Sequence, residues 1–139
     1  MKFMKSQSMK VSVTKEQEKQ LSAKSKIEEA CRDKDVLAFD IYRDDQLVGF
    51  VMLREYEKGC FFLWDYAIDH AFQNRHIGTA ALQELIELLK QQYGMHTMTT
   101  TYIWGNEHAK HIYEAVGFKE TDIVDEPDCH EVNMRLQCL

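Results

Sequence analysis

The middle of the chain alternates between β-forming runs and short polar runs. Residues 36–42 (VLAFDIY) and 47–56 (LVGFVMLREY) are rich in branched and aromatic side chains, and the polar run RDDQ separates them. This pattern predicts an antiparallel hairpin. After a second turn-like run at 57–59, residues 60–69 (CFFLWDYAID) have the same character. We therefore expect a meander of three strands.

A helical period replaces the strand pattern from residue 77. Between residues 77 and 93 apolar side chains recur at every third or fourth position, which predicts an amphipathic helix. These side chains are Ile77, Ala81, Leu82, Leu85, Ile86 and Leu89. Gly94 is placed to cap the helix, and residues 96–104 (HTMTTTYIW) then predict a strand. A strand that follows a crossover helix is expected to run parallel to the strand before it.

The last third of the chain predicts a short helix and a final pair of strands. Asn106 is a good N-cap, and apolar side chains up to Val116 line one face of the helix that follows. Gly117 ends that helix, with Phe118 placed for the hydrophobic contact beyond the cap. Residues 118–124 and 130–136 supply two strands. The fold class is therefore α/β, with a mixed sheet covered by helices.

The N-terminal region has a weaker pattern. We expect residues 1–10 to be loosely ordered, residues 10–13 (KVSV) to form a short strand, and residues 15 to about 33 to form a charged helix with few apolar anchors. The chain has no internal repeat, no low-complexity tract and one proline. No linker is predicted, so residues 1–139 are expected to form a single domain.

Composition narrows the functional classes. No run approaches the roughly 18 apolar residues of a membrane span, and the first ten residues lack the apolar segment of a signal peptide. A cytoplasmic protein without a membrane partner is expected. The net charge of −6 argues against a nucleic-acid partner. The four cysteines are scattered, and His108 and His111 have no evident third ligand, so no metal site is expected.

Residues 72–80 (FQNRHIGTA) join a predicted strand to the long helix. The start of a helix presents unpaired N–H groups and a partial positive charge, to which Arg75 and His76 would add. Gly78 would let a ligand approach the backbone. From the loop alone, an anion cradle and an ordinary polar helix entry both remain open. The glycine patterns of Walker and dinucleotide-binding loops are absent.

Two segments resemble a known family. QNRHIGTAAL, residues 73–82, resembles the acetyl-CoA pyrophosphate loop of the GNAT superfamily of N-acetyltransferases, whose pattern is [Q/R]-x-x-G-x-[G/A], except that His76 replaces the first glycine. If that position needs a positive φ, histidine adopts it at some cost. NEHAKHIYEAVGF, residues 106–118, matches the family segment N-x-x-A-x-x-x-Y-x-x-x-G-F at every marked position. Together with WDYAID, the resemblance covers about residues 36–136.

The resemblance implies a GNAT-like mixed, splayed β-sheet flanked by helices, with a shortened N-terminal α region. It implies an acetyl-CoA-dependent N-acetyltransferase whose splayed strands, 60–69 and 97–103, hold the pantetheine arm as an added strand. Acetyl-CoA would be a co-substrate, and no metal would be needed. The cofactor-binding residues implied are Tyr66, Ala67, Ile68, Gln73, Asn74, Arg75, His76, Ile77, Gly78, Thr79, Ala80, Asn106 and Tyr113.

For the chemistry, the resemblance implies direct attack of a primary amine on the thioester. Tyr113 is the expected acid and Asp65 the candidate base. The alternatives are a tyrosine that only packs on the sheet and a solvated or ion-paired aspartate. Polyamine acetyltransferases of the superfamily carry acidic residues at the positions of both Trp64 and Asp65, and strand alternation predicts Asp65 on the face opposite Trp64 and Tyr66. A polyamine or other small amine is the expected acceptor.

Two other functions remain open. Because of His76 and the short region before the first clear strand, the chain could instead be a non-catalytic acyl-CoA-binding regulatory module. A scaffold that binds no CoA is the third interpretation. The short N-terminal region also predicts an incomplete acceptor pocket, which a second subunit would complete, so the resemblance allows a homodimer.

Overall fold

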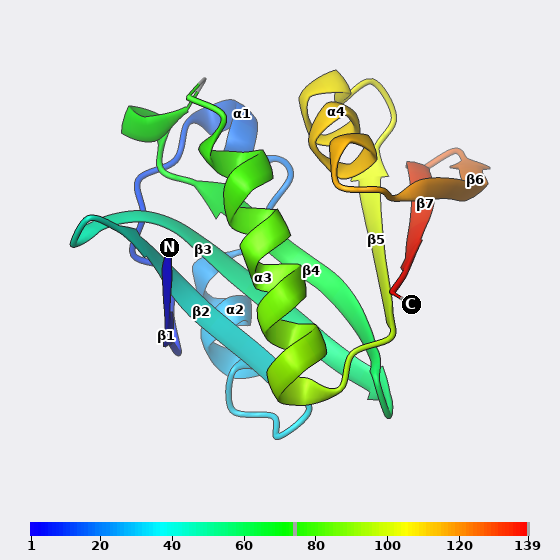
Figure 1. The fold of residues 1–139 in the computed structure, drawn as a ribbon. Coiled ribbons are helices and arrows are strands. Elements are labelled where there is room, and N and C mark those ends of the chain that lie inside the picture. The colour runs from blue at the N-terminus through cyan, green and yellow to red at the C-terminus, as the bar shows by residue number, and fades with distance from the viewer. Residues whose placement is uncertain (74, 139) are drawn as a thin grey trace.

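The structure is a computed structural model, and it describes residues 1–73 and 75–138. In this part of the chain one mixed sheet has the strand order β1-β2-β3-β4-β5-β7-β6 (Figure 1). The strands are β1 (Lys2–Lys5), β2 (Val36–Arg43), β3 (Gln46–Glu57), β4 (Cys60–Ile68), β5 (Thr97–Ile103), β6 (Lys119–Glu126) and β7 (Cys129–Gln137). The helices are α1 (Lys15–Glu18), α2 (Lys24–Ala30), α3 (Ile77–Tyr93) and α4 (Glu107–Ala115), with a 3₁₀ turn, η1 (His70–Phe72). The expected α/β class is confirmed.

The meander of β2, β3 and β4 is also confirmed, and its turns explain its register. Asp44 and Asp45 both have positive φ, 51° and 65°, as a two-residue hairpin turn of the right twist requires. At the second turn Gly59 has φ 80°, and a Cβ there would lie 2.4 Å from Cδ2 of His96. Only glycine fits that turn without moving the histidine ring.

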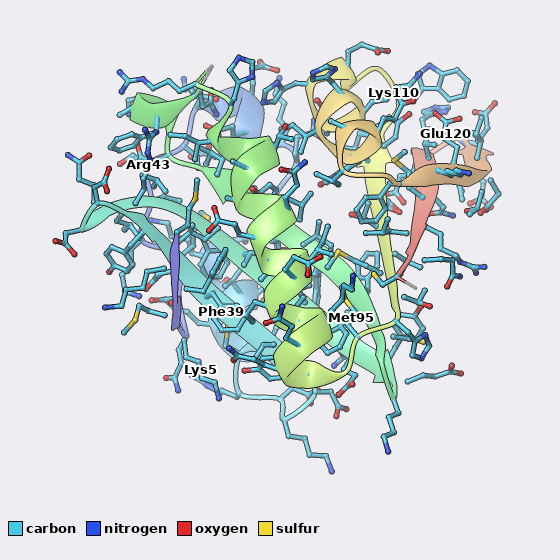
Figure 2. All side chains as sticks on the ribbon, in the orientation of Figure 1. Lys5, Phe39, Arg43, Met95, Lys110 and Glu120 are labelled. Carbon is cyan, nitrogen blue, oxygen red and sulfur yellow. The ribbon has the colours of Figure 1, made fainter. Side chains whose placement is uncertain are left out.

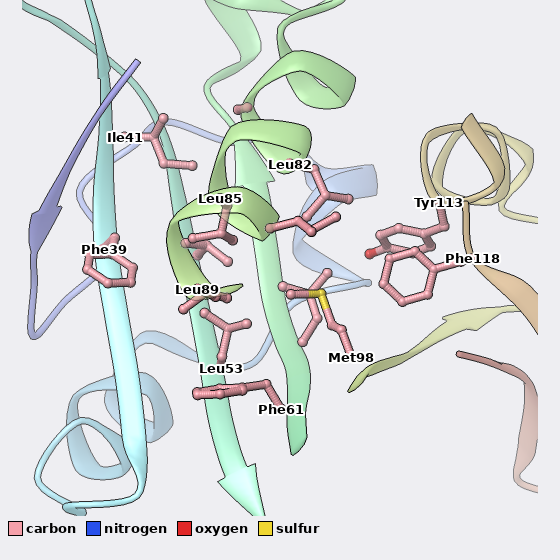
Figure 3. Packing of buried hydrophobic residues seen from close by; sticks show 14 of the residues in the cluster. Phe39, Ile41, Leu53, Phe61, Leu82, Leu85, Leu89, Met98, Tyr113 and Phe118 are labelled. Atoms are coloured by element: carbon pink, nitrogen blue, oxygen red, sulfur yellow. The ribbon is translucent and has the colours of Figure 1, made fainter. Parts of the chain in front are cut away.

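Helices cover both faces of the sheet (Figure 1). On one face Leu82, Leu85 and Leu89 of α3 are fully buried in a cluster with side chains of β2 to β5 (Figure 3). On the other face Ile27 of α2 is fully buried in a second cluster, which includes Met52 of β3. We call these the α3 face and the α2 face.

The parallel strands β4 and β5 stay together over only four residues. Cys60 to Leu63 pair with Thr97 to Thr100, and the strands then diverge (Figure 1). A β-bulge lies at the same point, because Leu63 faces Leu53 of β3 while Asp65 faces Met52, which leaves Trp64 as the extra residue. The expected splayed sheet is confirmed, and the β5-facing edge of β4 is open beyond Leu63.

The N-terminal region differs from the sequence-based expectation. Residues 2–5 form β1, which pairs with β2, so the prediction of a loosely ordered start was wrong. No strand forms at 10–13, and the single helix predicted from residue 15 is two short helices, α1 and α2. Among their residues only Ile27 is buried, which is too little apolar surface to hold one long helix on the sheet. The shortened region still supplies a strand and two helices.

Candidate active site

A cleft of about 490 Å³ opens where β4 and β5 diverge. It passes between the two strands, since its walls come from both faces of the sheet. Tyr66 and Tyr113 line it and pack with the cluster on the α3 face. Ala67, which belongs to the cluster on the α2 face, lines it as well. Two molecules that enter from opposite faces could therefore meet in this cleft.

The open edge of β4 borders the cleft. The N–H of Asp69 donates to the carbonyl of Val48 on β3, so the polar backbone groups of Ile68 point the other way, toward the open edge. By strand alternation those of Tyr66 point in the same direction. The Ile68 carbonyl accepts hydrogen bonds from Nε2 of Gln17, at 2.8 Å, and from Nε2 of Gln73, at 3.5 Å. This edge can accept a further strand-like ligand.

The start of α3 has the features of an anion site. His76 is its N-cap, with φ 59° and ψ 15° and no side-chain hydrogen bond to the helix. The first turn contains no acidic residue, and the N–H groups of residues 77–79 have no acceptor within the helix. Arg75 and His76 are exposed beside them. The condition stated from the sequence is met, because His76 does adopt a positive φ. Asn74 lies outside the described residues.

Gly78 has a packing role that the sequence did not indicate. A Cβ at this position would lie 3.0 Å from Cδ1 of Ile112 on α4. The Tyr66 hydroxyl donates to the Gly78 carbonyl at 2.5 Å. The small residue therefore lets α3 approach α4, and the hydrogen bond from Tyr66 ties the helix start to β4 beside the cleft.

Tyr113 is buried on α4 with its ring centroid 5.5 Å from that of Phe118, and its hydroxyl points toward β4 (Figure 3). Burial raises the pKa of Tyr113 to about 12; a hydrogen bond with Thr100 opposes this shift, and the charge of Asp65 adds to it. The phenol is thus protonated at neutral pH and can donate a hydrogen bond. Next to it, α4 is joined to β6 by Lys110 and Glu120, 3.9 Å apart (Figure 2).

Asp65 is only 2% exposed. Its Oδ1 accepts a hydrogen bond from the Ser22 N–H at 2.8 Å, and its Oδ2 has no partner among the described residues. Burial raises the pKa of Asp65, and the hydrogen bond from the Ser22 N–H opposes that shift. Asp65 is therefore buried and has no ion-pair partner among the described residues. A buried carboxylate with a free oxygen can accept a proton or a cation.

The predicted position of Trp64 was wrong. The bulge removes it from the regular alternation, and the Arg54 guanidinium lies 5.7 Å from the centroid of its ring. Arg54 is on β3 two residues after Met52, so Trp64 lies on the α2 face together with Asp65. Tyr66 is on the opposite face from Asp65, as expected.

Most of the predicted site residues converge on the cleft. Those that line it are Asp65, Tyr66, Ala67, Ile68, Gln73, Asn106 and Tyr113. The others form the start of α3; they are Arg75, His76, Ile77, Gly78, Thr79 and Ala80. Asn106 also caps α4, since its side-chain oxygen accepts from the Ala109 N–H at 3.2 Å. The cleft and the α3 start together form a continuous candidate site.

A family model matches most of the chain. The model described as the acetyltransferase (GNAT) family matches residues 6–118. The chain belongs to the GNAT acetyltransferase family. The membership confirms the expected resemblance and the expected class of enzyme. No curated protein matches the chain at a significant level.

Solved GNAT structures share the fold. The aminoglycoside acetyltransferase AAC(6')-Ib in complex with coenzyme A is 17% identical, with a TM-score of 0.68 over 83% of this chain and 76% of that one. A variant of spermidine N-acetyltransferase SpeG from Vibrio cholerae is 17% identical, with a TM-score of 0.71 over 83% and 75%. A GNAT family acetyltransferase from Elizabethkingia anophelis with acetyl-CoA bound is 16% identical, with a TM-score of 0.69 over 83% of both chains.

Sequence reasoning missed the N-terminal contribution to the GNAT cleft. Gln17 and the segment 19–22, between α1 and α2, line it, and Ser22 holds Asp65. Glu131 of β7 also lines it. Their positions depend on tertiary contacts that span more than 40 residues of chain, as between Ser22 and Asp65, and no local pattern signals them.

Two further properties concern only the described residues. Over residues 1–73 and 75–138, no group of three or more His, Cys, Asp or Glu side chains is placed to hold a metal ion. None of the helices found there is long and apolar enough to cross a membrane.

Proposed function

We propose that this GNAT protein transfers an acetyl group from acetyl-CoA to a primary amine by direct attack within a ternary complex. One observation carries the proposal: the cleft between β4 and β5 has a protonated phenol, Tyr113, on one face of the sheet and a buried carboxylate, Asp65, on the other. The fold neighbours determined with CoA or acetyl-CoA bound support the choice of acyl donor.

The start of α3 and the open edge of β4 fit the pyrophosphate and the pantetheine arm of acetyl-CoA. The free N–H groups of residues 77–79, with Arg75 and His76, would hold the pyrophosphate, since no acidic side chain of the first turn repels it. The backbone of Tyr66 and Ile68 would pair with the pantetheine arm. The Gln17 side chain donates to the Ile68 carbonyl, and an N–H group of the pantetheine arm would replace it there. Acetyl-CoA supplies the acyl thioester.

Asp65 is the proposed base. A primary amine has a pKa near 10.4 and is almost fully protonated at neutral pH, so it must lose a proton before it attacks. Oδ2 of Asp65 is free to accept that proton, directly or through one water molecule. The raised pKa of the carboxyl makes it a better proton acceptor than an exposed aspartate. The amine would approach from the α2 face.

Tyr113 is the proposed donor to the departing sulfur. As the new C–N bond forms and the C–S bond breaks, negative charge develops on sulfur, and the phenol can donate a hydrogen bond to it. With a pKa of about 12, Tyr113 is a weaker acid than a thiol of pKa about 8.5. Its main contribution is therefore a hydrogen bond that stabilises the thiolate while the phenol keeps its proton. The protons that the amine loses pass through Asp65 to solvent, and the thiolate takes up one proton from solvent.

A non-catalytic acyl-CoA-binding module is the second candidate function. Two observations favour it: the left-handed His76 at the place of a family glycine, and the Gln17 amide on the β4 edge. Such a module would bind acetyl-CoA without turnover.

The first experiment is a thermal titration of the protein with acetyl-CoA, with ATP as a phosphate-bearing control. At 100 times Kd a ligand specific for the native state adds about 2.7 kcal/mol, which raises Tm by several degrees. Thiol release in the presence of primary amines then separates the enzyme from the binding module. A shift without amine-dependent thiol release supports the module, and no shift with acetyl-CoA rejects both.

A further inference from the structure

We infer that the acceptor side of the cleft recognises a linear amine with two positive charges, one delivered to Asp65 and the other held by Glu131. The inference rests on the proposed amine acetylation and adds a residue that sets the acceptor specificity. Within the described residues, Asp65 and Glu131 are the carboxylates that line the cleft.

The two carboxylates lie on the same face of the sheet. On β7, Val132 belongs to the cluster on the α3 face. Because successive side chains of a strand point to opposite faces, the adjacent Glu131 points to the α2 face. Its partner across the sheet is Ile103 of β5. Asp65 faces Met52, which belongs to the cluster on the α2 face. An acceptor that enters from the α2 face would contact both.

The strand spacing sets the length of the acceptor. β5 lies between β4 and β7, so the strands of Asp65 and Glu131 are two spacings apart, about 10 Å, and more where β4 and β5 diverge. An extended chain of single bonds about 1.5 Å long advances a little over 1 Å per bond. Roughly eight or more bonds between the two nitrogens are therefore needed to reach both carboxylates.

The other charges near the cleft are already compensated. Lys19, which lines the cleft, is 3.2 Å from Glu16, and the other basic side chain of the lining is His108. Glu131 has no ion-pair partner in residues 1–73 and 75–138. It is half-buried, where a carboxylate retains more of its attraction for an ammonium than it would in open solvent. Phe62 and Trp64 line the same part of the cleft and offer apolar surface for methylene groups.

The test compares the terminal diamine of octane with octylamine, which differ in the distal ammonium. We expect the wild type to prefer the diamine in kcat/KM, and Glu131→Gln to reduce that preference about tenfold through KM, a loss of roughly 1.4 kcal/mol. Glu131→Asp should retain part of it. The preference for the terminal diamine of butane over butylamine should be the same in the wild type and in Glu131→Gln, because this diamine is too short to reach both carboxylates. Glu126→Gln, on the same hairpin and outside the cleft lining, is the charge-matched control.

The outcomes separate this inference from the proposed function. An equal loss of preference in Glu126→Gln and Glu131→Gln, or an unchanged preference in Glu131→Gln, overturns it. So does acetylation confined to the N-termini of peptides. If no amine is acetylated, calorimetry with the diamine in the presence of CoA decides. If diamine binding weakens about tenfold in Glu131→Gln and not in Glu126→Gln, the inference is supported and the proposed catalytic function is rejected. If the wild type does not bind the diamine at all, the inference is overturned.

Discussion

Asp65→Asn should remove activity and stabilise the fold. In the wild type a carboxylate that is 2% exposed makes one hydrogen bond, from Ser22, and leaves Oδ2 unpaired. Asparagine has nearly the same shape, and its carbonyl oxygen can still accept from Ser22. It carries no charge and cannot act as a base. We expect kcat for amine acetylation to fall by about 10² to 10⁴.

The stability gain follows from the missing partner of Oδ2. An unsatisfied buried polar group costs about 1 to 3 kcal/mol, and the cost is highest for a charged group. Part of that cost remains, because the asparagine NH₂ occupies the same place, so we expect a gain of about 1 to 2 kcal/mol at neutral pH. With 139 residues the entropy of unfolding is roughly 0.3 kcal/mol/K, so Tm should rise by about 3 to 7 °C.

The gain should depend on pH. The pKa of Asp65 is raised in the folded state, so below the ordinary carboxyl pKa of about 3.9 both states are protonated and the burial penalty is absent. As the pH rises above that value, the unfolded chain ionises first and the wild type loses stability relative to the variant. The difference between variant and wild type should therefore be larger at about pH 7.5 than at about pH 3.5, which lies below the ordinary carboxyl pKa.

Urea denaturation of both proteins at these two pH values measures the difference. Asp40→Asn is the matched control, since Asp40 is 5% exposed and its Oδ1 also has no partner among the described residues, but its Oδ2 is 2.9 Å from Nζ of Lys10. Loss of that ion pair should lower the free energy of unfolding by about 1 kcal/mol. A less stable Asp65→Asn variant, or a gain that is equal at both pH values, would refute the reasoning.

Three further substitutions test other parts of the site. Tyr113→Phe should lower kcat about 10²-fold or more and leave KM for acetyl-CoA unchanged, as steady-state kinetics would show; an unchanged kcat would leave Tyr113 with a packing role only. His76→Gly should be about 1 kcal/mol more stable to urea than His76→Ala, because φ is 59° at this position; equal stabilities would count against left-handed strain. Gly78→Ala should be nearly neutral, because a better helix former is offset by crowding against Ile112, and it should stabilise by up to about 1 kcal/mol when combined with Ile112→Val; a calorimetric Tm below that of the Ile112→Val parent would contradict this.

The sequence was sufficient where local periodicity and turn chemistry agree. The apolar spacing from Ile77 to Leu89 predicted α3, and the polar run at Asp44 and Asp45 predicted the first hairpin turn. Asn106 and Gly117 predicted both ends of the segment that carries Tyr113. In each case the residues that decide the structure lie within a few positions of one another.

The sequence was insufficient where a position depends on distant contacts. Residues 2–5 have no strand pattern that distinguishes them, and they are ordered because β2 offers them an edge. Ser22 lies in a polar connection, and only the folded chain places its N–H on Asp65. The sequence suggested that Gly78 lets a ligand approach the backbone, whereas in the folded chain the side chain of Ile112 lies beside it.

The bulge at Trp64 links the fold to the chemistry. If Leu63, Trp64 and Asp65 followed strict alternation without a bulge, Asp65 would lie on the same face as Leu63, which is in the cluster beneath α3. The bulge moves Asp65 to the α2 face at the point where the pairing of β4 with β5 ends. A carboxylate and an open strand edge therefore arise from the same irregularity, with Tyr113 reaching the cleft from the other face. Deletion of Trp64 should remove the bulge and leave Asp65 opposite Met52 on the α2 face, so a loss of acetyl transfer in a folded deletion variant would show that the chemistry depends on the open strand edge as well as on the position of the carboxylate.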